Sequence, residues 1–148
     1  MAAVPFPEFL MRGLSAIALG LLVTGLGVYA APAITPLAFP AAFTVQGHTT
    51  NPVALFVMLS ITLVSTAFGG WLTARLAEDH LLGHALMMAT VGLVSAVFVG
   101  AIRWAAAPSW YYVASWVLMP VAAAIGAAAW KRTLLRQRPD LARRAAAS

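Results

Sequence analysis

The chain has 148 residues, of which 62% are hydrophobic and 9% are charged, and its formal net charge is +5. Soluble domains carry charged residues at about a quarter of their positions, so this chain has too few to cover a globule with a polar surface. The apolar content also excludes a disordered polar segment. Cysteine is absent, which excludes a disulfide framework, a thiolate metal site and a cysteine nucleophile. An integral membrane protein is the class that remains.

Four apolar runs, in chain order, are long enough to cross a bilayer as helices. A hydrocarbon core about 30 Å thick needs roughly 20 apolar residues in a helix. In lipid the backbone must satisfy its own hydrogen bonds, and the runs lack the two-residue alternation of a barrel strand. We therefore predict an all-α membrane protein, with a bundle of four transmembrane helices in a single membrane domain. The predicted spans are 13–31, 53–74, 81–102 and 109–130.

The first run has an alternative interpretation as a secretory signal. The sequence VYAAP, which ends at Pro32, has small residues where a signal peptidase cleaves, and Arg12 precedes the run. The run is nevertheless longer than the roughly 7–15 residues of a signal-peptide core. We expect it to be retained as a span, and cleavage is the open alternative.

The segment 32–52, between the first two runs, contains four prolines and no Asp, Glu, Lys or Arg. Because proline lacks a backbone donor, we expect these prolines to break any long helix there. The stretch ITPLAFPAAF is apolar enough to lie in the membrane interface or to dip back as a re-entrant piece, whereas TVQGHTTN is polar. The loop is either an interfacial linker, which we favour, or a lid or partner surface.

Small residues recur at four-residue spacing in every run. Lipid tails supply no hydrophobic drive between helices, so membrane helices pack closely where small residues let their backbones approach. The spacing therefore predicts a compact bundle. The glycines of these stripes, which we expect at helix-packing faces, are Gly20, Gly69, Gly70, Gly92, Gly100 and Gly126. Pro120, within the fourth run, predicts a kink in that helix.

The charged residues in the middle of the chain fall in the segment GGWLTARLAEDHLLGH. His80 and His84 are four residues apart and would share a helix face, where imidazole and the nearby Glu78 and Asp79 suit zinc or iron. Two histidines are too few for a site, so we predict no metal and no cofactor and keep both as candidates. The charges also have structural roles, because Arg75 suits the end of the second helix and the acids suit the start of the third.

The stretch GGWLTARLA, followed by His84-Ala85 and then by Gly92, resembles small, uncharacterised bacterial integral membrane proteins with four helices. Those proteins have a Gly-Gly-aromatic segment, an Ala-Arg-hydrophobic-Ala exit and a His-Ala pair at the head of the next span. The likeness covers mainly the second and third runs. It implies a four-helix fold and a membrane location, and it carries over no activity and no catalytic residue.

Basic residues predict the orientation in the membrane. If the loops alternate sides, Arg12, Arg75 and the six basic residues of the tail 131–148 share one side, and Arg103 is alone on the other. The positive-inside rule makes the side with eight cytoplasmic, which puts both termini in the cytoplasm of a multi-pass bacterial inner-membrane protein. The position of the tail suits anionic lipid headgroups better than nucleic acid. The tail residues that we expect at headgroups are Lys131, Arg132, Arg136 and Arg138.

Ionisable residues inside the spans are nearly absent, although such residues are the usual sign of a functional site in a membrane. The third span contains His84 near its start, and the other three contain none. Proton-coupled carriers and membrane hydrolases need such groups. We therefore predict a non-enzymatic accessory or structural protein that forms a homo-oligomer or packs in a larger membrane complex. The alternative is a small dimeric carrier or channel for an apolar or weakly polar solute, indicated by Pro120 and the apolar first loop.

Overall fold

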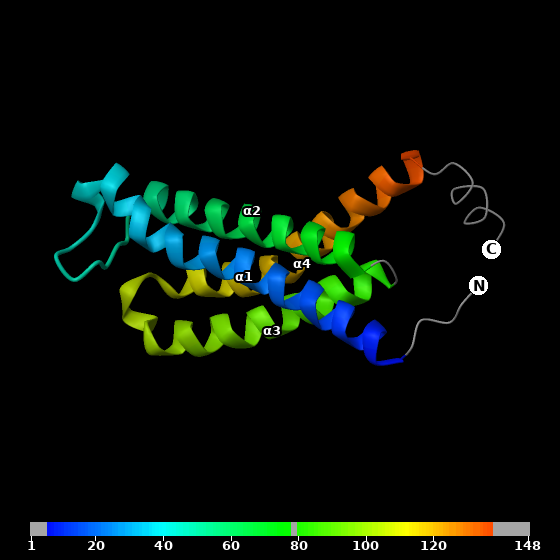
Figure 1. Cartoon of the computed structure of the whole chain (residues 1–148). Coiled ribbons are helices and arrows are strands. Elements are labelled where there is room, and N and C mark those ends of the chain that lie inside the picture. The colour runs from blue at the N-terminus through cyan, green and yellow to red at the C-terminus, as the bar shows by residue number, and fades with distance from the viewer. Residues whose placement is uncertain (1–5, 78–79, 138–148) are drawn as a thin grey trace.

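A computed structural model describes residues 6–77 and 80–137, which form four long helices (Figure 1). The connections contain two short 3-10 helices, η1 and η2, and the described residues contain no strand. The elements in chain order are α1 (Phe6–Ala38), η1 (Pro40–Ala42), α2 (Pro52–Ala77), α3 (Leu81–Ile102), η2 (Trp104–Ala106) and α4 (Ser109–Gln137). The predicted all-α architecture is confirmed.

All four helices are long and apolar enough to cross a membrane, with mean hydropathies between 1.7 and 2.2. Large apolar side chains point outward along them; Leu22, Phe56 and Phe98, for example, are each more than half exposed. Soluble monomers rarely expose apolar patches of such extent, whereas lipid tails are a suitable surrounding for them. The chain therefore fits a multi-pass helical membrane protein.

The first helix continues past its predicted end at residue 31. It runs to Ala38 and includes Pro32 and Pro36, so the prediction that prolines break the helix in segment 32–52 is wrong at these two positions. Proline removes only its own N–H and fixes φ near the helical value, and membrane helices tolerate it well. Most of the stretch expected to be interfacial or re-entrant is thus the last turns of α1, and the connection shortens to residues 39–51.

An Asn-Pro corner starts the second helix. The side-chain oxygen of Asn51 accepts hydrogen bonds from the backbone N–H groups of Val53 and Ala54, at 3.0 and 3.2 Å. Asn51 is therefore an N-cap, and Pro52 occupies the first helical position, where a missing N–H has no cost. This explains why the helix begins one residue before the predicted start at residue 53.

The remaining boundaries differ from the predicted ones by up to seven residues, because α1 begins at Phe6 instead of residue 13. The third helix has the predicted bounds, the second extends from residue 74 to Ala77, and the fourth extends from residue 130 to Gln137. The first residues of the predicted basic tail are therefore helical. Pro120 lies inside α4, which continues through it.

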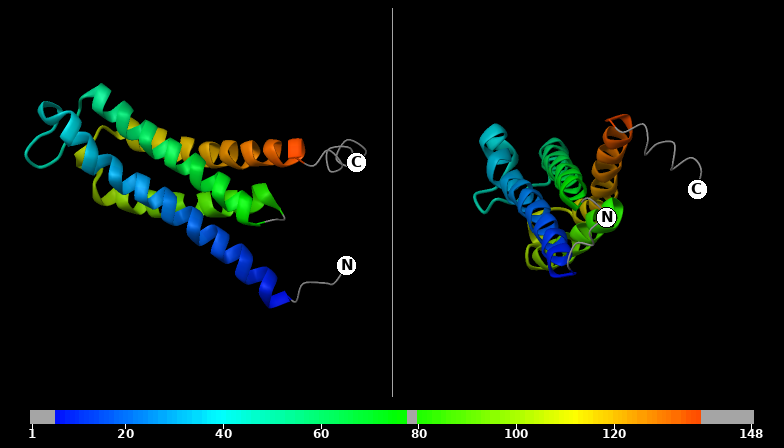
Figure 2. Two further views of the ribbon diagram at one scale, coloured as in Figure 1. Left: turned by 45° about the horizontal axis from the view of Figure 1, so that its top comes forward. Right: turned by 45° about the vertical axis from the view of Figure 1, so that its right-hand side comes forward.

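Successive helices run in opposite directions, so the bundle has two distinct ends (Figure 1). We call one the loop end; it holds the connections 39–51 and 103–108. The other is the turn end, which holds the short α2–α3 connection, the start of α1 and the end of α4, as both views in Figure 2 show. The α2 helix packs against all three others, most extensively against α1 and α4.

Small side chains build the core of the bundle. Ala16, Ala74 and Ala123 are fully buried, and so are the hydroxyl-bearing Thr66 and Thr73. Glycine, alanine and threonine leave little side chain between neighbouring backbones, so the helices approach closely. This close contact holds at the turn end and the centre, and it gives way to a cavity nearer the loop end.

Candidate functional site

The two histidines singled out by the sequence lie at the turn end. His80 is exposed and precedes α3 with a left-handed backbone, φ 48°. His84 is half-buried; its Nδ1 is 3.3 Å from the His80 carbonyl oxygen, and its Nε2 would be 2.9 Å from a Cβ atom at Gly13 of α1. Residues 6–77 and 80–137 contain no group of three His, Cys, Asp or Glu able to hold a metal ion. Glu78 and Asp79 lie outside these ranges.

Gly20 and Gly69, two of the predicted packing glycines, join α1 to α2. A Cβ atom at Gly20 would overlap the Thr73 hydroxyl, and one at Gly69 would overlap the Thr24 hydroxyl. The Thr73 hydroxyl donates to the Gly69 carbonyl at 2.9 Å and lies 3.3 Å from the Ala16 carbonyl of the other helix. Neither glycine leaves room for a side chain, so the two backbones are in direct contact here.

Gly70 and Gly126 join α2 to α4 in the same way. A Cβ atom at Gly70 would overlap the carbonyl oxygen of Ala123, and one at Gly126 would overlap that of Ala67. Farther toward the loop end, Gly100 of α3 lies under an indole ring of α4 instead of a backbone. The close-packing glycines are therefore used inside this chain, between its own helices.

The basic cluster at the end of α4 is exposed at the turn end. Its described members are Lys131, Arg132 and Arg136, and Arg138 lies outside the described residues. Their exposure keeps all three side chains available to lipid headgroups.

Arg75 makes contacts that the sequence interpretation missed. Its guanidinium lies over two indole rings, 5.3 Å from the ring centroid of Trp71 and 5.6 Å from that of Trp130. These cation–π contacts connect the turn ends of α2 and α4. The signal was present in part, because Trp71 precedes Arg75 by one helical turn, but only the fold brings Trp130 to the same place.

A cavity of about 370 Å³ lies in the loop-end half of the bundle. All four helices contribute to its walls, which are mainly apolar; Leu21, Val28, Met58, Val99 and Met119 are among the lining residues. Ligand pockets in proteins have volumes of about 300–1,000 Å³ and walls of this character. This cavity is therefore the strongest candidate site among the described residues.

Two glycines leave open space in this cavity, whereas the glycines described above lie at close helix–helix contacts. A Cβ atom at Gly92 would meet its nearest neighbours, the side chains of Leu21 and Met119, at the ordinary distances of 3.7 and 3.9 Å. A Cβ atom at Gly25 would meet nothing within 4 Å. Gly92, which we had expected at a packing face, thus forms part of the cavity wall.

The helical wall of the cavity is least covered along α1 and α3. Its exposed helical lining residues, Tyr29, Val91 and Ser95, all belong to these two helices, which we take as the lateral opening. By contrast, Met119 of α4 and Met58 of α2 are 2% and 8% exposed. If the helices span a bilayer, the opening faces lipid tails.

Thr24 is the one buried side chain with an unpaired polar atom in the described part of the chain. It lines the cavity, its residue is 3% exposed, and its hydroxyl oxygen has no hydrogen-bond partner. The buried hydroxyls of Thr66 and Ser115 instead donate to the carbonyl four residues earlier. An unpaired buried hydroxyl costs about 1–3 kcal/mol, so such groups in native proteins need a specific reason.

Aromatic rings and one arginine surround the loop end of the cavity. The Tyr112 hydroxyl donates to the Arg103 backbone carbonyl, and the Arg103 side chain interacts electrostatically with the same phenol. The Tyr112 ring stacks on Trp104, with centroids 5.3 Å apart, and lies 6.3 Å from the Trp116 ring. The backbone of Arg103, a residue that indicated only orientation in the sequence, is thus held at the cavity rim.

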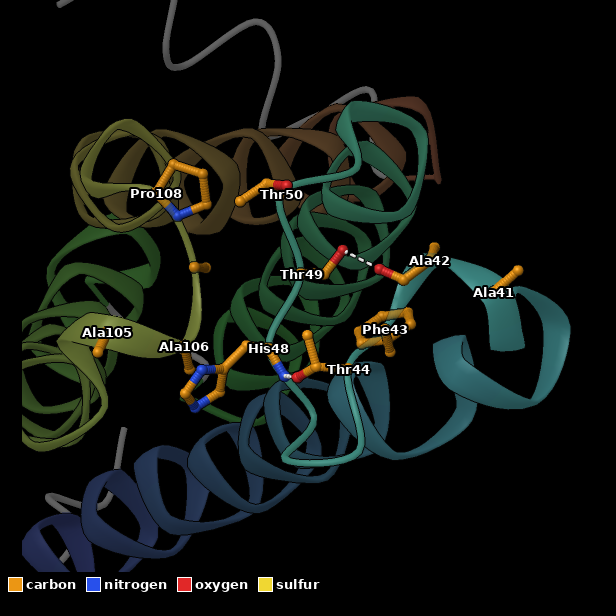
Figure 3. A pocket seen from close by; sticks show the side chains of 11 residues that line it. Ala41, Ala42, Phe43, Thr44, His48, Thr49, Thr50, Ala105, Ala106 and Pro108 are labelled. Atoms are coloured by element: carbon orange, nitrogen blue, oxygen red, sulfur yellow. Dashed lines mark hydrogen bonds between the residues drawn. The ribbon is translucent and has the colours of Figure 1, made fainter.

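The connection 39–51 closes the loop end and separates the cavity from a shallow outer hollow of about 470 Å³ (Figure 3). Phe43, Thr49, Ala106 and Ala107 line both spaces and so form the partition between them. Thr49 holds this partition, because its N–H donates to the Ala106 carbonyl at 3.1 Å and its hydroxyl donates to the Ala42 carbonyl at 2.7 Å.

No protein family, curated protein or solved structure compared with this chain matches it. The functional interpretation therefore rests on the geometry and chemistry of the cavity.

Proposed function

We propose that this protein is a non-enzymatic membrane carrier that holds one small, largely apolar molecule in the cavity between its helices. The observation that carries this proposal is the mainly apolar cavity of about 370 Å³, which residues from all four helices line. A largely apolar molecule of this size would fill the space and contact its apolar walls.

The lining residues support binding without chemistry. Arg103 is the one lining residue with a formal charge, and it stands at the rim. Ser95 and Ser115 both line the cavity, but each donates its hydroxyl to a carbonyl of its own helix. With no carboxylate or histidine beside them, these hydroxyls have no base of the kind that activates a nucleophile.

The positive-inside rule supports a location of the cavity in the outer half of the membrane. With both termini in the cytoplasm of a bacterial inner membrane, the loop end is the outer end. The cavity would then lie in the outer leaflet half of the membrane, and the partition around Thr49 would close it from the outside solution.

The accessory function, in which the protein self-associates or joins a larger complex, remains a second candidate. It rests on the glycine-rich faces and on the scarcity of ionisable residues inside the spans, but Gly20, Gly69, Gly70 and Gly126 are occupied within the chain. The outward apolar face of α3, where Val94 and Phe98 are 66% and 69% exposed, is available to a partner as well as to lipid. A dimer in mild detergent, detected by native mass determination, would support this candidate, and a strict monomer without a co-purifying partner would oppose it.

Native mass spectrometry of the protein released from mild detergent tests the carrier proposal. We expect the wild-type chain to retain an additional small mass, and Gly92→Leu to lose it because the new side chain fills the cavity. Gly83→Leu at the turn end, where a Cβ atom would meet only the His80 side chain at 3.8 Å, is the comparison variant for a general effect of added bulk. A wild-type chain that carries no additional mass, or a mass that survives in Gly92→Leu, would contradict the proposal.

A further inference from the structure

We propose that the occupant of the cavity is an anionic amphiphile, with one apolar chain in the cavity and a carboxylate or phosphate head at Arg103. This inference rests on the carrier proposal and adds the class of the ligand. Three features of the loop-end half lead to it: an arginine without an acidic partner, the length of the cavity, and its opening toward lipid.

Arg103 has no carboxylate to pair with at its end of the bundle. The chain contains four acidic residues, and neither 13–77 nor 80–137 includes any of them. The loop end is built entirely from these two ranges. The Arg103 side chain is exposed, and a guanidinium presents a planar fork of donors that matches carboxylate and phosphate groups, so it is available to an anionic head from outside the chain.

The rim holds Arg103 in place for such a head. Its backbone ends α3, with its N–H donating to the Val99 carbonyl at 3.0 Å, and its own carbonyl accepts the Tyr112 hydroxyl. Trp104 and Trp116 flank the same phenol. Tryptophan and tyrosine rings prefer the headgroup level of a membrane, which is where the head of an amphiphile lies.

The cavity is about as long as the alkyl chain of an amphiphile that occupies one leaflet. Along α3 it extends from Val91 to Arg103, and at a rise of 1.5 Å per residue this is roughly 18 Å. Half of a hydrocarbon core of about 30 Å is roughly 15 Å thick, which is close to this length. An amphiphile oriented like a membrane lipid would therefore place its head at Arg103 and its chain end near Gly92.

The lateral opening gives such a molecule a route from the bilayer. Tyr29 of α1 and Val91 of α3, which flank the opening, are 66% and 49% exposed. An amphiphile in the outer leaflet could slide between the two helices without its chain passing through water. The head would remain at the interface throughout, so no charge would need to cross hydrocarbon.

Binding of matched ligands to the full chain in zwitterionic lipid nanodiscs tests this inference. The probes are dodecanoic acid, dodecyl phosphate and dodecanol, each brominated midway along the alkyl chain, and the readout is saturable quenching of tryptophan fluorescence, to which Trp116, whose ring lies at Gly100 in the cavity wall, contributes. Gly92→Leu supplies the non-specific background from bilayer partitioning. We expect both anions to bind roughly ten-fold or more tightly than the alcohol, and Arg103→Gln to remove most of this difference.

The outcomes separate this inference from the carrier proposal. If acid and alcohol bind equally, or if Arg103→Gln leaves the preference for anions intact, the anionic class is wrong while a saturable signal sensitive to Gly92→Leu still supports a carrier. If none of the three probes gives such a signal, both proposals fall. Unchanged melting temperatures of the variants ensure that a loss of binding is not a loss of fold.

Discussion

Gly126 and Gly92 differ in the space that surrounds them. A Cβ atom at Gly126 would overlap the Ala67 backbone, whereas one at Gly92 would meet only side chains at ordinary contact distance. The first glycine permits contact between α2 and α4, and the second leaves space in the cavity. Substitution by alanine should separate the two roles.

We predict that Gly126→Ala destabilises the bundle by about 1–3 kcal/mol, because α2 and α4 must move apart. Gly92→Ala should be neutral or stabilising by up to about 1 kcal/mol, because alanine is the better helix former. Thermal unfolding of both variants in one detergent measures the difference. Equal destabilisation of the two would mean that Gly92 is also a packing residue.

Thr24→Val replaces the unpaired hydroxyl by a methyl group of similar shape. We expect the empty protein to gain about 1 kcal/mol of stability, because a buried polar group without a partner is removed. Melting curves of the wild-type chain and the variant measure this difference, and a less stable variant would show that Thr24 has a structural role.

The sequence identified the residues of the site only in part. It placed Gly20, Gly69 and Gly126 in small-residue stripes, because the spacing alone carries that signal. It could not separate Gly92 from them, since the difference depends on which side chain of another helix stands opposite. Arg103 appeared only as a lone charge, because its place at a cavity rim follows from the tertiary fold.

At the scale of the element, α1 and its connection to α2 depart most from expectation. Proline rules drawn from soluble helices predicted a break that does not occur at Pro32 or Pro36. The real end of the helix and the start of α2 depend on specific contacts. Two of these contacts are made by Thr49, whose hydroxyl donates to the Ala42 carbonyl and accepts from the Asn51 N–H.

Thr49→Val should loosen this connection without unfolding the helices. The variant loses two side-chain hydrogen bonds, each contributing about 0.5–1.5 kcal/mol, while its backbone bond to Ala106 can persist. We expect faster amide hydrogen exchange in residues 42–51 and faster ligand release, with exchange in α2 and α4 unchanged. Thr50→Val, at an exposed position of the same connection, is the matched control. Exchange that stays at the wild-type rate would show that Thr49 does not hold the partition.

For the whole molecule, the number and approximate positions of the helices were predictable because a span needs roughly 20 apolar residues. The third helix has the predicted bounds, whereas α1 extends from Phe6 to Ala38 and α4 continues to Gln137, beyond their apolar runs. The arrangement of the helices was not predictable in the same way. Every helix has a small-residue face, so only three-dimensional packing shows that α2 lies against all three others.

The proposed orientation can be tested with single cysteines, because the natural chain contains none. Val45→Cys lies in the loop-end connection at a fully exposed position, and Thr133→Cys lies on the exposed end of α4. In intact cells we expect a membrane-impermeant maleimide to label the first variant once the outer membrane is permeabilised, and to label the second only after lysis. The reverse pattern would invert the topology and move the cavity to the inner leaflet.

The most direct measurement is a crystal structure of the wild-type protein with chain-brominated dodecanoic acid, phased to locate bromine by anomalous scattering. We predict one bromine peak inside the cavity near Gly92 and Thr24, with the carboxylate within hydrogen-bonding distance of the Arg103 guanidinium. An empty cavity, with bromine only on the outward apolar faces of the helices, would contradict the account.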